Sequence, residues 1–410
     1  MPVTLPPRPL TPDPRPPLFT APFVLVCLAT YCYFLAHQLC LLAMPLYALH
    51  RGGAETDAGK ITMVFSIAAL VARLPIGWVM DRWGRRPVVV GGAVLGAGAA
   101  LLYLTAETMG GIFAVRPLHG IALGFFSTAT AAVVTDVVPA PRRGEGMGYF
   151  GMGSNLALAL GPVLSLAIVN RFSFPPLFLL AAGIASLGAI MGACIRETGV
   201  RTAHPPPITL ASVFVPSAIF PGIIMGTLTV CHGALVTFLP LLGRAREVGN
   251  PGMFFSVAAV LLVAVRAKAG ALSDRWGRGP VILPGMFLAA FAMGLVGLAF
   301  RPLTLLAAGA CYGVGLGLAV PAMMALVGDR ARPADRGRAI ATFYTGWELG
   351  IGMGAYPLGY LLAATNFTVM YATAGLITAA GGLGFLFWNA RGRHRGDPAA
   401  RRRFGRKGPP

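Results

Sequence analysis

The side chains best suited to chemistry in this sequence are ionisable groups embedded in apolar stretches: His37, Arg116, His232 and Glu348. A charge among apolar residues costs free energy, so each is a functional candidate by default. Desolvation favours the neutral carboxyl group, which makes proton exchange at Glu348 accessible near neutral pH. A histidine can titrate or hydrogen-bond a bound molecule. The alternatives are a static ion pair between Glu348 and an arginine of another helix, and a packing role for one of the two histidines.

Signatures of an enzyme are absent from the sequence. It contains no nucleotide-binding loop of the Walker type, no Ser/His/Asp nucleophile pattern and no cluster of metal ligands. His37 and His232 are too few for a zinc site and have no Cys or acid at ligand spacing. We therefore expect no catalysis, no cofactor and no metal. Because the sequence has no ATP-binding loop, any transport by this chain would have to draw its energy from an ion gradient.

The elements that position these groups are predicted to be membrane helices. Of the 410 residues, 56% are hydrophobic and only 11% charged, with a mean hydropathy of +0.72, which is more apolar surface than a soluble domain buries. Apolar runs of about 20 residues, the length of one bilayer crossing, recur along the chain. We predict an all-α integral membrane protein with twelve spans, at 20–46, 59–80, 87–107, 110–135, 146–169, 175–195, 211–241, 252–272, 281–299, 303–327, 339–363 and 367–388.

These spans divide the chain into two groups of six. The first 17 residues are Pro-rich and lack the apolar core of a signal peptide. All six cysteines fall in predicted spans, so we expect packing roles rather than disulfides. The predicted organisation is a disordered cytosolic tail at 1–19, a six-helix bundle at 20–195, a cytosolic linker at 196–210, a second six-helix bundle at 211–388 and a basic cytosolic tail at 389–410.

The net charge of +19 is distributed unevenly along the chain. Most Lys and Arg residues lie on the side of the predicted spans that holds both termini, so the positive-inside rule places both termini in the cytosol. We accordingly predict a multi-pass protein of a prokaryotic cytoplasmic membrane, acting as a monomer, with no nucleic-acid partner. The tail at 389–410 either contacts anionic lipid headgroups or only orients the last helix.

One loop sequence occurs twice. GWVMDRWGRRPVVV at 77–90 returns as GALSDRWGRGPVIL at 270–283, an offset of 193 residues that also relates Asp136 to Asp329. The chain is therefore a tandem duplication of six helices. An even number of helices preserves orientation, so the two halves should be related by an axis along the membrane normal.

The first copy of this loop resembles the signature loop of the major facilitator superfamily, between its second and third helices. The resemblance implies that family's twelve-helix fold, and a cytosolic latch of Asp81, Arg85 and Asp136 that holds while the cavity faces outward. The glycines of the loop should allow close packing, and Asp81 could cap a neighbouring helix. The alternative is that these charges only anchor helix ends. The matching residues are Gly77, Asp81, Arg82, Gly84, Arg85 and Arg86, with an imperfect second set of Gly270, Asp274, Arg278 and Asp329.

Two further strings extend the resemblance. Arg116 and Gly120 are similar to the family's R-x-x-x-G element, which implies a role in proton coupling or in holding a substrate's negative charge; the alternative is an arginine snorkelling to the interface. Gly148, Gly161 and Pro162 resemble the motif of the family's antiporters, although Ser165 and Leu166 depart from it. This favours export.

Two features of the sequence bear on the substrate. The segment 141–162 resembles bacterial exporters of drugs and of small metabolites, including opine-type metal chelators. The polar residues Gln38, Asn155 and Trp347 join His37, His232 and Glu348 in spans that would line a central cavity, and this mixture suits a drug or a zwitterionic chelator. We predict a proton-coupled exporter of a small organic molecule. The alternative is a proton-coupled importer of an organic anion, with Arg116 as the substrate clamp.

Overall fold

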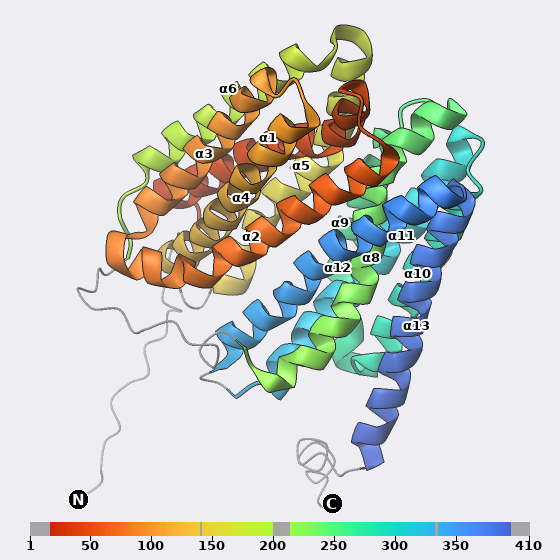
Figure 1. Cartoon of the computed structure of the whole chain (residues 1–410). Coiled ribbons are helices and arrows are strands. Elements are labelled where there is room, and N and C mark those ends of the chain that lie inside the picture. The colour runs from red at the N-terminus through yellow and green to blue at the C-terminus, as the bar shows by residue number, and fades with distance from the viewer. Residues whose placement is uncertain (1–16, 140–141, 200–213, 333–334, 395–410) are drawn as a thin grey trace, which may run out of the picture.

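The computed structural model describes residues 17–139, 142–199, 214–332 and 335–394. Within these ranges the chain forms twelve long helices in two groups of six (Figure 1). The first group is α1 (Ala21–His50), α2 (Glu55–Trp83), α3 (Arg85–Thr105), α4 (Met109–Val137), α5 (Arg143–Phe172) and α6 (Phe174–Cys194). The second is α8 (Pro216–Arg246), α9 (Gly252–Trp276), α10 (Gly279–Gly297), α11 (Pro302–Arg330), α12 (Arg336–Ala364) and α13 (Phe367–His394).

Local chemistry starts several of these helices. Proline stands in the first turn of α1, α6, α8, α10 and α11, where its missing N–H costs no hydrogen bond. The Thr108 hydroxyl accepts a hydrogen bond from the Gly111 amide at 3.2 Å and caps α4. The Asp57 carboxylate accepts one from the Ala54 amide at 2.9 Å in the first turn of α2. The starts of these helices are therefore encoded locally.

Each of the twelve predicted spans corresponds to one helix, and the largest differences at helix ends, five or six residues, occur at α8 and α13. The seventh span was predicted from 211, but α8 begins at Pro216, because the preceding Val215 is extended and its amide donates to the Thr342 hydroxyl at 3.0 Å. The last helix was predicted to end at 388, but α13 continues to His394. The predicted terminal tails and the linker fall largely outside the described residues.

The two groups pack in the same way. In the first group, α1 contacts α5 and α6, α2 contacts α4, and α3 contacts α6. In the second group, α8 contacts α12 and α13, α9 contacts α11, and α10 contacts α13. This correspondence agrees with the duplication in the sequence. Between the groups, α2 packs on α12 and α5 packs on α9.

The contacts between the two bundles concentrate at one end of the molecule. We call the end where α1 begins and α13 ends the terminal end; the bundles meet near the other end and diverge toward this one (Figure 1). At the far end, an added Cβ at Gly59 of α2 would lie 2.5 Å from the Ala355 carbonyl oxygen of α12. The Asn250 side-chain amide, before α9, donates to the Val163 carbonyl oxygen of α5 at 3.1 Å. The molecule is closed at the end opposite its termini.

Much of the outer surface is apolar. Ten of the described helices are individually long and apolar enough to cross a bilayer, and α9 makes eleven if its two parts, bent by 50°, count as one span. The α12 helix is not among them, since it carries polar residues such as Glu348 along its length. Large apolar side chains on several helices are exposed, including Val71 and Leu376 at 55% and 70%. Such a surface suits lipid.

Candidate functional site

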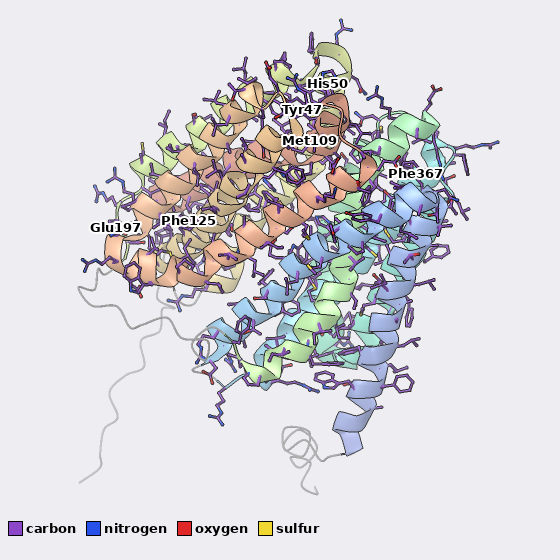
Figure 2. All side chains as sticks on the ribbon, viewed as in Figure 1. Tyr47, His50, Met109, Phe125, Glu197 and Phe367 are labelled. Atoms are coloured by element: carbon purple, nitrogen blue, oxygen red, sulfur yellow. The ribbon has the colours of Figure 1, made fainter. Side chains whose placement is uncertain are left out.

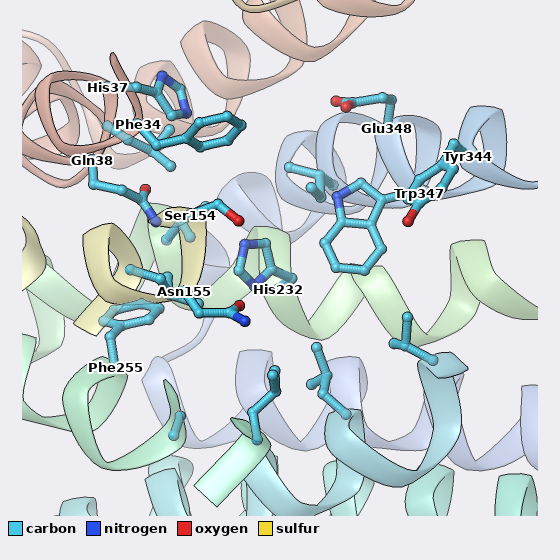
Figure 3. A pocket seen from close by; sticks show the side chains of 18 of the residues that line it. Phe34, His37, Gln38, Ser154, Asn155, His232, Phe255, Tyr344, Trp347 and Glu348 are labelled. Atoms are coloured by element: carbon cyan, nitrogen blue, oxygen red, sulfur yellow. The ribbon is translucent and has the colours of Figure 1, made fainter. Parts of the chain in front are cut away.

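A cavity of about 370 Å³ lies between the two bundles. Helices α1, α2 and α5 of the first bundle and α8, α9, α11 and α12 of the second line most of it. In Figure 3, residues of α1 and α5 face Tyr344 and Trp347 of α12 across it. Six of the residues selected from the sequence line this cavity: His37, Gln38, Asn155, His232, Trp347 and Glu348. Arg116 does not.

Glu348 forms an ion pair that joins the two bundles. Its carboxylate, 6% exposed, accepts from the Arg73 guanidinium of α2, and Arg73 also contacts the Ser127 hydroxyl at 3.4 Å. The static-pair alternative thus has a definite partner, and the pair lines the cavity. Because the carboxylate is buried with a single counter-charge, adding a proton to it would leave Arg73 uncompensated.

His37 belongs to a buried chain of polar groups. Its Nδ1 lies 3.4 Å from Nε2 of His119 on α4, and His119 Nδ1 lies 3.2 Å from the Tyr103 hydroxyl. The imidazoles of His37 and His119 and the phenol of Tyr103 are all buried. Only His37 of the three lines the cavity, so the chain leads from the cavity into the first bundle.

Arg116 is sealed within the first bundle. It is 1% exposed, its Nε donates to the Ile61 carbonyl oxygen at 3.1 Å, and its guanidinium lies 4.6 Å from the centre of the Phe65 ring. The alternative of snorkelling to the interface is therefore wrong. One terminal nitrogen of Arg116 has no hydrogen-bond partner among the described residues. In this conformation the Phe65 ring stands between Arg116 and a molecule in the cavity, since Phe65 lines that cavity.

His232 occupies a different environment from His37. Its Nδ1 lies 3.2 Å from the Tyr312 hydroxyl, and its ring centre lies 5.8 Å from that of Trp347. All three residues line the cavity. Tyr312 lies 193 residues after His119, so the His232–Tyr312 contact is the counterpart of the His37–His119 contact, with a phenol in place of the second imidazole.

The repeated loops lie at the terminal end. Gly84 is the single residue between α2 and α3, and Gly277 directly follows α9. Both glycines have a positive φ, 96° and 93°. Glycine adopts such a φ without the strain of a side chain. The expected close packing at Gly77 is wrong, because an added Cβ there, or at Gly270, would meet nothing within 4 Å.

The first loop forms only part of the expected latch. Arg85 pairs with Asp136, whose carboxylate also accepts from the Thr198 hydroxyl at 2.9 Å. Asp81 is exposed and forms no hydrogen bond or ion pair with any described residue. In the second loop, which was expected to be the imperfect copy, the set is complete in this conformation. There Arg278 contacts Asp274 at 2.6 Å and Asp329 at 2.9 Å.

Glu197 performs the capping that Asp81 was thought able to perform. Its carboxylate accepts from the Arg85 and Arg86 amides at 2.8 and 3.2 Å, and so caps α3. The Thr198 and Gly199 amides add bonds at 3.1 and 3.0 Å. Partial burial raises the pKa of the Glu197 carboxyl, but these four backbone N–H groups outweigh it and the net pKa is lowered. Glu197 lies at the opposite end of the molecule from His50 and Met109 (Figure 2).

The α5 residues of the antiporter-like motif have separate surroundings. An added Cβ at Gly161 would lie 2.5 Å from Cβ of Gln38 on α1, whereas at Gly148 it would meet nothing within 4 Å. The carbonyl carbon of Pro162 lies 2.6 Å from the Cβ position of Gly252 on α9. Close packing thus holds at Gly161 and Pro162 but not at Gly148.

Sequence reasoning missed four residues around these sites. Arg73 and Arg266 line the cavity, His119 contacts His37, and Glu197 caps α3. The 193-residue offset, which relates Arg73 to Arg266, was a usable signal for the two arginines. His119 lay within the quoted string RPLHGIALG. No comparable signal marked Glu197.

Comparisons with known proteins agree on one family. The family model of the Major Facilitator Superfamily matches residues 26–267 and 245–408. The staphylopine export protein of Staphylococcus aureus is 22% identical over 371 residues, covering 87% of this chain and 93% of that protein. The multi-drug resistance efflux pump PmrA of Streptococcus pneumoniae is 25% identical over 360 residues, with coverages of 81% and 87%. A solved structure of a POT family transporter with 5-aminolevulinic acid has a TM-score of 0.76 at 15% identity, covering 90% and 96% of the chains.

Proposed function

This chain belongs to the Major Facilitator Superfamily, and on that premise we propose that it exports a small organic molecule in exchange for protons by alternating access. It is a secondary transporter rather than an enzyme. Proton coupling, the direction of transport and the substrate class are the proposed parts.

The Arg73–Glu348 pair carries the proton-coupling proposal. Glu348 is a buried carboxylate that lines the cavity, and its partner lies on the opposing bundle. Protonation of Glu348 removes the attraction between α2 and α12, so proton binding and the contact between the bundles are linked. The chain from His37 through His119 to Tyr103 supplies further groups that exchange or share protons.

The names of two relatives support export. Two relatives are named as an export protein and an efflux pump. With both termini in the cytosol, as the positive-inside rule predicts, the end that is closed here faces outward, and the cavity is reached from the cytosol. An exporter loads and an importer releases its substrate in this conformation, so the proposed direction rests on the relatives. Latch closure through Asp81 would belong to the opposite conformation.

The proposed substrate is a drug-like molecule or a small metabolite, a class that includes opine-type metal chelators; the staphylococcal relative is named as a staphylopine export protein. The cavity combines aromatic rings, such as Phe255 and Trp347, with amide donors of Gln38 and Asn155. The importer alternative has less support, because Arg116, its assigned clamp, lies outside the cavity lining.

Proton flux in sealed proteoliposomes tests the proposal. Under an imposed proton gradient, lumenal pH is recorded while drugs and chelator-type metabolites are added in turn. We expect a substrate-dependent proton flux opposite to substrate movement in the wild type. Glu348→Gln should abolish this flux but keep part of the substrate exchange. Glu107→Gln, at an exposed acid in the loop after α3, should behave like the wild type.

Two outcomes would contradict the proposal. Movement of protons and substrate in the same direction would establish the importer. Unchanged coupling in Glu348→Gln would remove the role of Glu348.

A further inference from the structure

Two arginines occupy equivalent places in the duplicated halves. Arg73 on α2 and Arg266 on α9 are separated by the repeat offset of 193 residues, and both line the cavity. In the assembled molecule α2 packs on α12 of the other bundle, and α9 packs on α5. Each arginine therefore lies on a helix that meets the opposite bundle in an equivalent way.

Only one of these arginines has an acid to neutralise it. Glu348 of α12 pairs with Arg73, but the residue 193 positions before Glu348 is Asn155 of α5, which lines the same cavity. An amide has no charge to offset a guanidinium. Arg266 is exposed and forms no ion pair or hydrogen bond with a described residue.

The cavity consequently carries an excess positive charge. With the histidines neutral, the charged side chains in its lining are two arginines, Arg73 and Arg266, and one acid, Glu348. A guanidinium presents a planar fork of donors that matches a carboxylate, sulfonate or phosphate, and its attraction for an anion is stronger in a cavity than in bulk water.

The remaining lining selects the body of such an anion. Much of it is aromatic, with the rings of Phe34, Phe65, Phe255, Tyr312 and Trp347. These rings provide apolar contact area but cannot neutralise a charge.

We propose that Arg266 binds the anionic group of the transported molecule, and that this molecule is an organic anion with an apolar or aromatic body. Asn155, by replacing the acid at the equivalent of Glu348, leaves Arg266 available. The inference rests on the proposed function, because it takes the cavity as the transport site. It holds for either direction of transport.

Binding of a matched pair of probes to the detergent-purified full chain tests the assignment. Naphthalene-2-sulfonate supplies an anion on an aromatic body, and 2-naphthylmethanol supplies a similar body without charge. Changes in tryptophan fluorescence report occupancy, since Trp347 lines the cavity. We expect the wild type to prefer the sulfonate, and Arg266→Gln to weaken sulfonate binding about tenfold or more while leaving the alcohol unaffected.

Two further variants separate the site from general charge effects. Lys268→Gln removes one positive charge two residues along α9, outside the cavity lining, and should bind the sulfonate like the wild type. Asn155→Glu restores the acid of the other half and should weaken sulfonate binding with Arg266 still present. The proposal is overturned if the wild type shows no preference for the sulfonate, if Arg266→Gln binds it unchanged, or if Lys268→Gln weakens it equally.

Failure of this proposal is distinguishable from failure of the proposed function. Probe binding in detergent involves no gradient and no transport, whereas the proteoliposome assay measures proton coupling directly. A sulfonate-binding protein without proton flux would keep the Arg266 site and refute the coupling. If the protein transports only uncharged substrates with proton coupling and does not bind the sulfonate, the coupling is kept and the Arg266 site is refuted.

Discussion

At the scale of single residues, Glu197 joins the segment after α6 to the start of α3. Its carboxylate is bonded to the amides of Arg85 and Arg86, which begin α3 and have no partner within the helix. The negative charge also lies at the positive end of the helix dipole. The cap therefore couples the end of the first bundle to the junction of α2 and α3, close in sequence to Asp81 in the last turn of α2.

We predict that Glu197→Gln lowers the stability of the protein by about 1 kcal/mol near neutral pH, the size of a lost charged helix cap. Because the pKa of Glu197 is lowered in the folded state, its contribution is complete above the ordinary glutamate pKa, about 4.3, and is lost as pH falls through the lower folded value. Melting temperatures of both proteins in detergent between pH 3 and 7 measure this. The difference should shrink on acidification.

Glu107→Gln is the matched control, because Glu107 is exposed and caps no helix. Its melting temperature should follow the wild type across the pH range. A Glu197→Gln deficit that grows on acidification would contradict the capping account.

At the scale of elements, sequence reasoning succeeded where the bilayer itself dictates the answer. The spans were predictable because each must cover the hydrocarbon thickness with apolar residues, so run length and hydropathy suffice. Six of the seven candidates for coupling or substrate contact lie in the cavity lining, and the duplication, which aligns helices such as α1 and α8, helped to select them. The pairing of Arg73 with Glu348 was missed, because it joins α2 to α12, and no local pattern specifies contacts between the halves.

The packing of α2 on α12 holds the far end of the molecule closed. Gly59 lies so close to the Ala355 carbonyl oxygen that an added Cβ would be 2.5 Å away, and both groups belong to helix backbones that cannot yield locally. We predict that Gly59→Ala separates the bundles at this end and lowers the population of the present conformation. Spin labels on Glu107→Cys and Arg301→Cys, in exposed loops of opposite bundles, measure the separation by double electron–electron resonance.

The labels require a background in which the six native cysteines are replaced. Gly183→Ala on α6 is the control, since its Cβ would meet nothing within 4 Å and the distance distribution should stay unchanged. An unchanged distribution in Gly59→Ala would show that this contact does not hold the end closed.

At the scale of the whole molecule, the two loops differ in a way that the sequence could not reveal. The first loop, which has the full G-x-x-x-D-R-x-G-R-R pattern, contains Asp81 with no ion-pair partner among the described residues. In the second loop, which departs from the pattern, Arg278 pairs with both Asp274 and Asp329. One sequence serves both conformations of an alternating-access carrier, and a given pair need form in only one of them. An unpaired Asp81 agrees with its proposed role as a latch for the opposite conformation.

A cross-link at the cavity floor can report the balance between conformations. Thr62 of α2 and Thr237 of α8 lie on opposite bundles, with their hydroxyl oxygens 2.9 Å apart. We predict that Thr62→Cys with Thr237→Cys, in the background without native cysteines, forms a disulfide under mild oxidation. Transport should stop when it forms and return on reduction, because alternating access requires these helices to separate.

Adding Asp81→Asn to this cross-linking pair tests the latch itself. If Asp81 stabilises only the opposite conformation, its loss raises the share of molecules in the present one, so the disulfide should form more completely and transport should be nearly lost in folded protein. Glu55→Gln, at the other end of α2, removes an acid of the same helix and should leave both readouts unchanged. Equal cross-linking with and without Asp81→Asn would mean that this carboxylate anchors a helix end and takes no part in the conformational balance.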